Sequence, residues 1–124
     1  MNPYLSQEKL VEFCKNNSIE VVAYSPIGRA DKEILNEPIL TEIAANNNKT
    51  VPQVMLRWII QRDIIAIPKT SKTHRLQENI NIFDFQLTDE EMKKIFTLNK
   101  NRRIITQSMS IDHREYPFSI PYRR

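Results

Sequence analysis

The chain has 124 residues, of which 40% are hydrophobic and 27% are charged, a balance that is ordinary for a soluble globular protein. The formal net charge of +3 is mildly basic, and a chain of this length forms one domain at most. The single cysteine, Cys14, excludes an internal disulfide and a cysteine-based zinc site, and no apolar run approaches the length of a membrane span, so we expect a cytoplasmic protein without a metal and without membrane contact.

The first expected helix covers about residues 7–16, with Ser6 as its N-cap. Its inner face should consist of Leu10, Val11, Phe13 and Cys14. The pair Asn17-Ser18 should end this helix, because asparagine accepts a left-handed C-cap more readily than most residues other than glycine. The run 20–24 is rich in β-branched residues and predicts a buried strand that ends at Ser25-Pro26.

Two further helical patterns follow the loop that contains Gly28, the only glycine of the chain. The first covers about residues 38–47, and its inward positions are Ile39, Leu40, Ile43 and Ala44. The second covers about residues 52–62, and Thr50 with Gln53 predicts a capping box at its start. This helix is apolar on nearly every side, so it should be buried between layers by Val54, Met55, Leu56, Trp58, Ile59 and Ile60.

The second expected strand, residues 64–67, should also be buried, and it leads into the most informative turn of the chain. The turn 68–71 carries a lysine and two hydroxyls, and the helix after it places Arg75, Glu78 and Asn79 on one face. Because a helix N-terminus favours anions, this corner would suit a phosphate with an aromatic base attached. The opposite face is an apolar stripe expected to pack on a sheet, formed by Leu76, Ile80 and Phe83.

Thr88 and Glu91 predict a second capping box, and the helix that follows should bury Met92, Ile95, Phe96 and Leu98. After Asn101 the pattern becomes an irregular tail. Part of the positive charge gathers there, in Arg102, Arg103, Arg114, Arg123 and Arg124. We interpret it as a solvated basic tail, since a nucleic-acid patch would need aromatic residues or a readout helix beside it.

The alternation of strands and helices predicts βαβ units with a parallel sheet. Two strands cannot form a parallel sheet that is covered on both faces, as such sheets normally are. A closed (β/α)8 barrel takes about 250 residues, roughly twice the length of this chain. The expected fold class is therefore α/β, as an incomplete (β/α)8 barrel.

Several short segments are distinctive in combination. In chain order they are Asn2-Pro3-Tyr4-Leu5, Tyr24-Ser25-Pro26-Ile27-Gly28, Thr50-Val51-Pro52-Gln53-Val54 with Leu56-Arg57-Trp58, Ile67-Pro68-Lys69-Thr70 with Arg75, Glu78 and Asn79, Phe83-Asp84-Phe85 before Leu87-Thr88-Asp89-Glu90-Glu91, and finally Asp112-His113 with Glu115-Tyr116-Pro117-Phe118. Together they closely resemble the aldo-keto reductases. The resemblance covers nearly the whole chain but only the C-terminal part of such an enzyme, from about barrel strand 6 to the tail, including strands 7 and 8 with their helices.

The resemblance implies an NADPH-dependent reductase that reduces small aldehydes and ketones on a TIM barrel. It implies that Tyr24 stacks on the nicotinamide, and that Ser25, Ile27 and Gly28 lie along the pyrophosphate. The loop between Gly28 and Pro38 is shorter than in members that fold a long clasp over the cofactor, which implies looser cofactor retention.

The same resemblance assigns the phosphate and adenine contacts. Lys69 and Thr70 resemble the lysine and serine that bind the 2′-phosphate, and Arg75 resembles the arginine beside that phosphate and the adenine. Glu78 and Asn79 resemble the residues that hydrogen-bond the adenine amine. The chemistry is consistent, because a phosphate needs cations and hydroxyl donors.

The catalytic acid of this family is a tyrosine assisted by lysine, aspartate and histidine, all upstream of the region represented here. No residue of this chain matches those positions, so we assign none as catalytic and expect the chain alone to be inactive. His74 and His113 are not credible substitutes.

We expect residues 1–100 to be the barrel portion and residues 101–124 a tail that shapes substrate specificity. The tail should form an apolar wall of Met109, Ile111, Tyr116, Phe118 and Ile120.

Three interpretations remain open. The chain is the C-terminal portion of a reductase, with Met1 as an internal methionine read as a start. Alternatively it is a short protein without catalysis that binds a nucleotide or a partner through exposed sheet edges. The least favoured is a nucleic-acid binder that uses the basic tail.

Without the resemblance, the better interpretation of Tyr24 would be an aromatic side chain that packs in the mouth of the barrel. Lys69 and Arg75 would then be explained equally well as solvated residues at the start of a helix. We expect Cys14 and Trp58 to be core residues.

Overall fold

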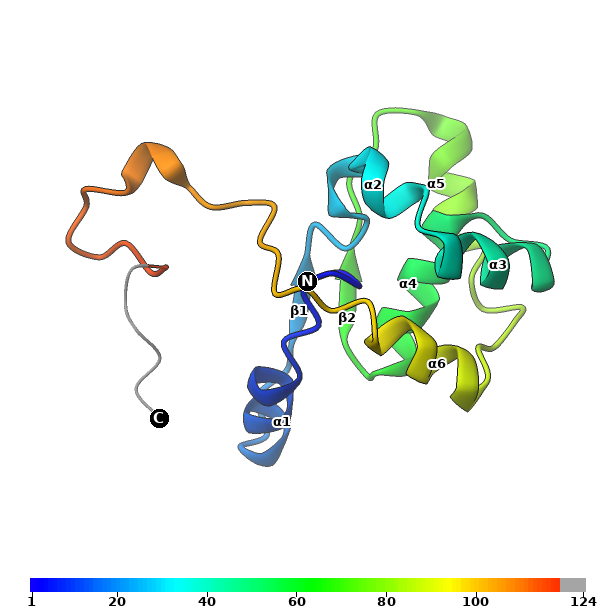
Figure 1. Cartoon of the computed structure of the whole chain (residues 1–124), viewed down its shortest axis with the longest axis horizontal. Helices are drawn as coiled ribbons and strands as arrows, with labels where there is room; N and C mark the ends of the chain where they lie inside the picture. Colours follow the sequence, from blue (N-terminus) through cyan, green and yellow to red (C-terminus); the bar gives the residue numbers. More distant parts are fainter. Residues whose placement is uncertain (119–124) are drawn as a thin grey trace.

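The computed structural model describes residues 1–118, so the expectations for Ile120, Arg123 and Arg124 lie outside it. Two short strands, β1 (Val22–Tyr24) and β2 (Ile65–Ile67), run parallel and form the only sheet within that range. The helices of residues 32–96 lie to one side of the two strands, the helix of residues 8–16 lies on the other side of β1, and the chain after residue 96 extends away from the core (Figure 1). The expected α/β class is confirmed.

The five expected helices occur in the expected order, and one further helix, of residues 32–35, and two 3-10 turns were not predicted. The helices are α1 (Glu8–Asn16), α2 (Lys32–Leu35), α3 (Pro38–Asn46), α4 (Val51–Gln61), α5 (Thr73–Ile80) and α6 (Asp89–Phe96), with short 3-10 turns η1 (Gly28–Ala30) and η2 (Ser108–Ser110). No helix in residues 1–118 has the length and apolar character that crossing a membrane requires.

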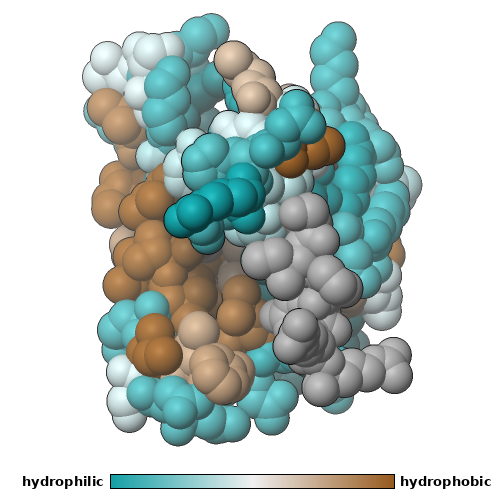
Figure 2. Space-filling view, turned by 90° about the vertical axis from the view of Figure 1, so that its left-hand side faces the viewer, coloured by the Kyte–Doolittle hydropathy of each residue, from teal (hydrophilic) through white to brown (hydrophobic). Residues whose placement is uncertain are grey.

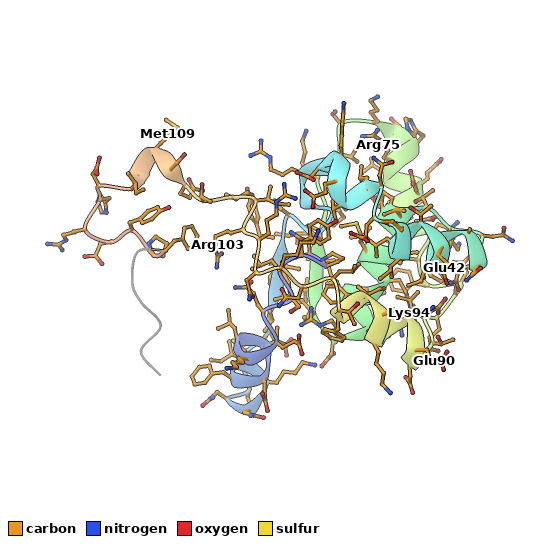
Figure 3. The ribbon with its side chains drawn as sticks, in the orientation of Figure 1. Glu42, Arg75, Glu90, Lys94, Arg103 and Met109 are labelled. Atoms are coloured by element: carbon orange, nitrogen blue, oxygen red, sulfur yellow. The ribbon has the colours of Figure 1, made fainter. Side chains whose placement is uncertain are left out.

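Helix α4 is the centre of the hydrophobic core and contacts α3, α5 and β2. Trp58 and Ile59 are fully buried, and Phe96 of α6 meets the Trp58 ring edge-on at 5.3 Å between ring centroids. Lys94 of α6 pairs with Glu42 of α3 on the outside of this core (Figure 3). The prediction of a buried helix is confirmed for Val54, Met55, Leu56, Trp58 and Ile59, whereas Ile60 is only half-buried.

Both predicted capping boxes are present. At α4, the N–H of Gln53 donates to the Thr50 hydroxyl, and the Gln53 side chain accepts from the N–H of Thr50 at 2.9 Å. At α6, Thr88 and Glu91 exchange the same pair of bonds. These reciprocal bonds satisfy two N–H groups that the first turn of a helix otherwise leaves unpaired.

The predicted stop of α1 at Asn17-Ser18 is confirmed, whereas the predicted N-cap and the residue expected to adopt the left-handed conformation are wrong. Ser6 does not cap the helix, because its hydroxyl donates to the Glu8 carboxylate at 3.1 Å and Gln7 occupies the N-cap in a left-handed conformation. At the other end, Ser18 rather than Asn17 adopts a positive φ, of 56°. The Asn17 amide donates to the carbonyl of Phe13, which satisfies the helix end without a left-handed backbone at Asn17.

The prediction that both strands are buried is also wrong. Ala23 is buried under the helices, whereas Val22 and Ile65, which face each other in the register, are each 50% exposed. Tyr24 and Ile67 continue this open face. The helices cover one face of the sheet, and nothing within residues 1–118 covers the other, which contributes to the broad apolar area visible in Figure 2.

Two helices expose the apolar stripes that the sequence pattern assigned to the interior. On α1 only Val11 is buried, while Leu10 and Phe13 are exposed and Cys14 is half-buried, so the expected core position of Cys14 is wrong. The stripe after β2 does not pack on the sheet either, as Leu76, Ile80 and Phe83 are all exposed. An amphipathic pattern identifies the apolar side of a helix but not whether the chain contains an element to cover it.

Candidate functional site

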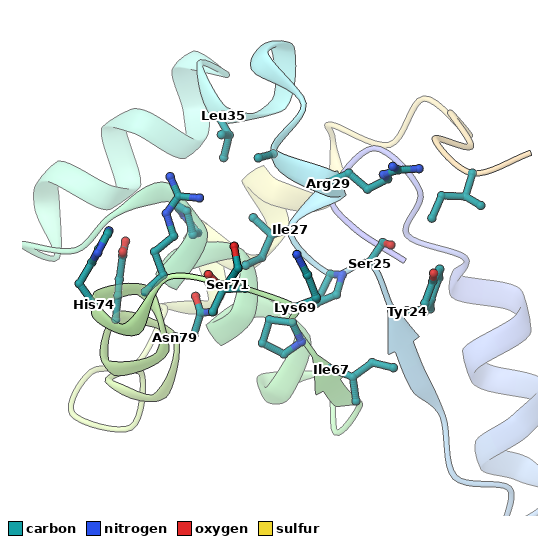
Figure 4. A pocket seen from close by; sticks show the side chains of 18 residues that line it. Tyr24, Ser25, Ile27, Arg29, Leu35, Ile67, Lys69, Ser71, His74 and Asn79 are labelled. Atoms are coloured by element: carbon teal, nitrogen blue, oxygen red, sulfur yellow. The ribbon is translucent and has the colours of Figure 1, made fainter.

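A cavity of about 820 Å³ opens at the C-terminal ends of β1 and β2. Its volume lies within the range of about 300–1,000 Å³ that small-molecule and cofactor sites occupy. Figure 4 shows that it extends from Tyr24 at the end of β1, past Ile27 and Lys69, to Asn79 and His74 on α5. The ends of parallel strands are where α/β proteins bind ligands, because the loops there are free to vary.

The β1 side of the cavity combines an aromatic ring with a tight turn. Tyr24 is 64% exposed, so one face of its ring is available to a flat ligand. The chain then turns through Ser25, which has a positive φ of 52° and whose carbonyl accepts from the N–H of Gly28 at 3.0 Å. This turn places Ile27 in the lining of the cavity. Gly28, the next residue, is buried and does not line the cavity.

The β2 side supplies cations and hydroxyls. The strand ends at Pro68, and Lys69, Thr70 and Ser71 form the connection to α5. The Thr70 hydroxyl accepts from the N–H of Lys72 at 3.1 Å, which shapes this turn. Within residues 1–118, neither Lys69 nor Arg75 forms an ion pair, so both positive charges are available to an anion in the cavity.

Helix α5 is held against the start of α4 by polar contacts. The Thr50 hydroxyl donates to the Glu78 carboxylate at 2.5 Å, and the Gln53 amide donates to the carbonyls of Glu78 and Asn81. Because Gln53 is almost fully buried, these bonds fix the orientation of the α5 face that carries Arg75.

The cavity brings together eight of the nine residues predicted to bind a cofactor: Tyr24, Ser25, Ile27, Lys69, Thr70, Arg75, Glu78 and Asn79. Gly28 does not line it, because Gly28 is buried against the side chains of Ile104 and Ile34. That these residues bind a cofactor stays a prediction.

Several lining residues had no place in the sequence-based site, among them Arg29, Ala30, Leu35, Pro52, His74 and Ile105. Arg29 and Ala30 directly follow Gly28, so their position in the loop after the strand was a sequence signal that could have placed them at the site. His74 precedes Arg75 on the same helix start. Pro52 and Ile105 had no signal in the sequence, because their place at the cavity depends on tertiary packing.

Within residues 1–118, the tail contributes one residue to the cavity lining. Ile105 lines it, whereas Met109 is fully exposed on η2 and lies far from Arg75 in Figure 3. Tyr116 is buried within the tail, where its hydroxyl donates to the carbonyl of Thr106. Within residues 1–118, the members of the predicted apolar wall are therefore not part of the cavity lining.

A sequence profile of the Aldo/keto reductase family matches residues 1–100. The mouse aldo-keto reductase family 1 member D1 is 44% identical over 130 residues, an alignment that covers 98% of this chain and 40% of the mouse protein. The uncharacterized oxidoreductase YtbE of Bacillus subtilis is 43% identical over 103 residues, covering 83% of this chain and 36% of the bacterial protein.

Solved structures give the same picture. The aldose reductase from Schistosoma japonicum superposes with a TM-score of 0.89 at 38% identity, covering 98% of this chain and 39% of that one. A Bombyx mori aldo-keto reductase in complex with NADP superposes with a TM-score of 0.84 at 41% identity, covering 94% and 41% of the two chains. The chain spans about two fifths of the length of these relatives, and its fold is that of part of a TIM barrel.

Proposed function

This chain belongs to the aldo/keto reductase family, an NADP-binding family of oxidoreductases, and we propose that it forms the cofactor-binding portion of an NADPH-dependent reductase of aldehydes and ketones. In this proposal β1 and β2 are strands 7 and 8 of the barrel, and residues 101–124 form the tail beside its mouth. The observation that carries the proposal is the cavity at the strand ends, with a cationic end at α5 and an aromatic end at Tyr24.

The residues of the cavity fit a phosphorylated dinucleotide. Lys69 and Arg75 would bind the 2′-phosphate together with the Thr70 hydroxyl, because no carboxylate of residues 1–118 is paired with either cation. Glu78 and Asn79, one helical turn further along, would accept from and donate to the adenine. The Glu78 carboxylate already accepts from Thr50, which would hold it in place for this contact.

The β1 end would hold the reactive part of the cofactor. Tyr24 would stack on the nicotinamide, and Ser25 and Ile27 would lie along the pyrophosphate. Gly28 would contribute indirectly, because its positive φ allows the tight turn that brings Ile27 into the cavity. When bound, NADPH supplies the hydride that reduces the carbonyl.

The acid that protonates the alkoxide would come from the part of the barrel that this chain does not span. Among the tyrosines of residues 1–118, only Tyr24 lines the cavity. Tyr4 is fully buried elsewhere, and burial together with its hydrogen bond to Glu37 raises the pKa of its hydroxyl above the ordinary value. A general acid must lie within hydrogen-bond reach of the reacting oxygen, and Tyr4 lies outside the cavity lining.

Ligand-induced stabilisation tests this proposal. We expect NADPH to raise the melting temperature of the chain more than NADH does at equal concentration, since only NADPH carries the 2′-phosphate. The double substitution Lys69→Met and Arg75→Met should remove most of the difference between the two cofactors. Lys94→Met is the matched control, because Lys94 pairs with Glu42 on α3 and does not line the cavity. A preference for NADPH that survives the double substitution would contradict the assigned phosphate site.

A second candidate function rests on the open face of the sheet. Val22, Tyr24, Ile65 and Ile67 leave an apolar surface that monomeric soluble proteins normally cover. The chain would then bind a partner polypeptide without catalysis. Coexpression with the N-terminal part of a family member distinguishes the two candidates, because a reductase portion should restore carbonyl reduction when the barrel is completed.

A further inference from the structure

The loop after β1 depends on contacts from the far end of the chain. Residues 28–35, here called the cavity loop, contain the single turn η1 and the single turn α2. Three of its residues, Arg29, Ala30 and Leu35, line the cavity. Single turns are not stable alone, so something outside the loop must hold it in place.

Asp31 connects the cavity loop to the chain after α6. Its Oδ1 accepts from the N–H groups of Glu33 at 3.0 Å and Ile34 at 3.4 Å, which caps α2. Its Oδ2 accepts from Nη2 of Arg102 at 3.0 Å. One carboxylate thus both starts the helical turn and binds the tail, so the position of Arg102 and the geometry of α2 are coupled.

Arg102 also reaches a second carboxylate of the loop. Its Nη1 donates to Oε2 of Glu33, and Nζ of Lys100 donates to Oε1 of the same side chain at 3.0 Å. The hydrogen bond from Lys100 and the nearby charge of Arg102 lower the pKa of the Glu33 carboxyl below its ordinary value. The planar guanidinium of arginine can bridge two acceptors in this way, which a lysine ammonium does less well.

The chain that carries Arg102 is itself anchored. The backbone N–H groups of Lys100 and Arg102 both donate to the carbonyl of Tyr4, at 3.1 and 3.0 Å. Tyr4 is fully buried, and its hydroxyl donates to Glu37 at 2.5 Å, immediately after the loop. The Arg102 side chain therefore extends from a backbone held by hydrogen bonds to a loop that contains only two single turns.

We propose that Arg102 is a positioning residue that holds the cavity loop over the cavity through Asp31 and Glu33. Arg102 does not line the cavity itself and acts only through the loop. The loop in turn places Arg29, Ala30 and Leu35. As far as the ligand of the cavity is concerned, the proposal rests on the proposed function: the Arg102 bridge would slow the release of the dinucleotide, in place of a longer loop folded over it.

Hydrogen exchange of the 124-residue chain tests the bridge without any ligand. In Arg102→Met, the N–H groups of residues 31–37 should exchange roughly fivefold faster, because a pair of half-exposed ion pairs is lost. Arg102→Lys should restore part of the protection. Lys94→Met removes a more exposed ion pair, between α6 and α3, and should leave the exchange of residues 31–37 unchanged (Figure 3). The exchange of α4 in the same sample reports whether the core is intact.

Salt provides a second measurement that needs no variant. Raising the ionic strength of the wild-type chain should accelerate exchange in residues 31–37 and leave α4 unchanged, because the Arg102 pairs are partly exposed. Equal exchange in Arg102→Met and in Lys94→Met, or exchange in residues 31–37 that does not respond to salt, overturns the role of Arg102.

Stopped-flow release of NADPH then tests the consequence for the ligand. We expect roughly fivefold faster release from Arg102→Met than from Lys94→Met, in proportion to the loss of loop protection. Equal release rates from a loosened loop would overturn the retention part of the proposal. If the wild-type chain binds no NADPH, the proposed function fails, while the exchange experiment still decides whether Arg102 holds the loop.

Discussion

Gly28 is the residue at which the backbone of the site is least tolerant of change. It has a φ of 59°, and a Cβ added to it would lie 3.1 Å from Cδ1 of Ile104 and 3.4 Å from Cγ2 of Ile34. We expect Gly28→Ala to lower the free energy of unfolding by about 1–2 kcal/mol, from the left-handed backbone and the crowding together. Urea unfolding followed by circular dichroism measures this change.

Ala30 is the natural control for that substitution. It also has a positive φ, of 58°, but it is exposed, so a Cβ is already accommodated there at the cost of backbone strain. Ala30→Gly should therefore leave stability unchanged or raise it by up to about 1 kcal/mol. If Gly28→Ala were as stable as the wild type, the close packing of Ile104 over this turn would be contradicted.

At the residue scale, the sequence could predict chemistry better than backbone detail. Lys69 and Arg75 are close in the chain and lie on a strand-to-helix turn, so their common position on one cavity follows from local structure. The role of Arg102 was not predictable, because its carboxylate partners lie about 70 residues away in the chain. The same holds for Ile105, whose place depends on how the tail crosses the loop.

At the scale of elements, the two capping boxes differ in one respect that can be measured. Thr88 caps α6 only, whereas Thr50 caps α4 and also donates to the Glu78 carboxylate of α5. Thr88→Ala should lower the free energy of unfolding by about 1 kcal/mol, and Thr50→Ala by about 1–3 kcal/mol, because a bond to a charged group is lost as well.

The comparison of Thr50→Ala with Thr50→Ser isolates the role of the hydroxyl. Serine keeps both bonds and should retain most of the stability in urea unfolding. Costs that are equal for Thr50→Ala and Thr88→Ala would mean that the contact with Glu78 contributes nothing to stability. The hydrogen bond from Thr50 to Glu78 would then not be one of the contacts that orient α5 at the cavity.

Helix patterns predicted the elements well and their burial less well. The bounds of α3 and α4 agree closely with the expected 38–47 and 52–62, because capping residues and hydrophobic period are local signals. The apolar stripes of α1 and α5 were expected to be covered, and they are exposed. The chain spans about two fifths of its relatives, and a sequence pattern records a surface that is buried in a whole barrel without saying which chain segment buries it.

At the scale of the whole molecule, the open sheet face should make the isolated chain associate. Exposed apolar strands beside unpaired strand edges are typical sites of unwanted pairing. We expect wild-type chain to sediment as oligomers at micromolar concentration, and Val22→Lys with Ile65→Lys to shift it towards the monomer. Both positions are half-exposed, so the charges should be tolerated by the fold.

Met109→Lys is the control for the added charge, because Met109 is fully exposed on the tail and away from the sheet. It should leave the sedimentation of the chain unchanged. A wild-type chain that remains monomeric and melts sharply over the same range of concentration would contradict both the association and the incompleteness of the barrel.

The anchoring of Tyr4 has a consequence for the order in which the protein can form during synthesis. Its carbonyl accepts from Lys100 and Arg102, and the N–H of Ser6 bonds to Asn99, which is 93 residues later in the chain. The N-terminal segment therefore cannot reach its final place until nearly all of residues 1–102 have left the ribosome. The packing of α3 on α4 can form before that point, because those contacts are close in sequence. Residues 1–6 pack last, after the strands and helices that follow them.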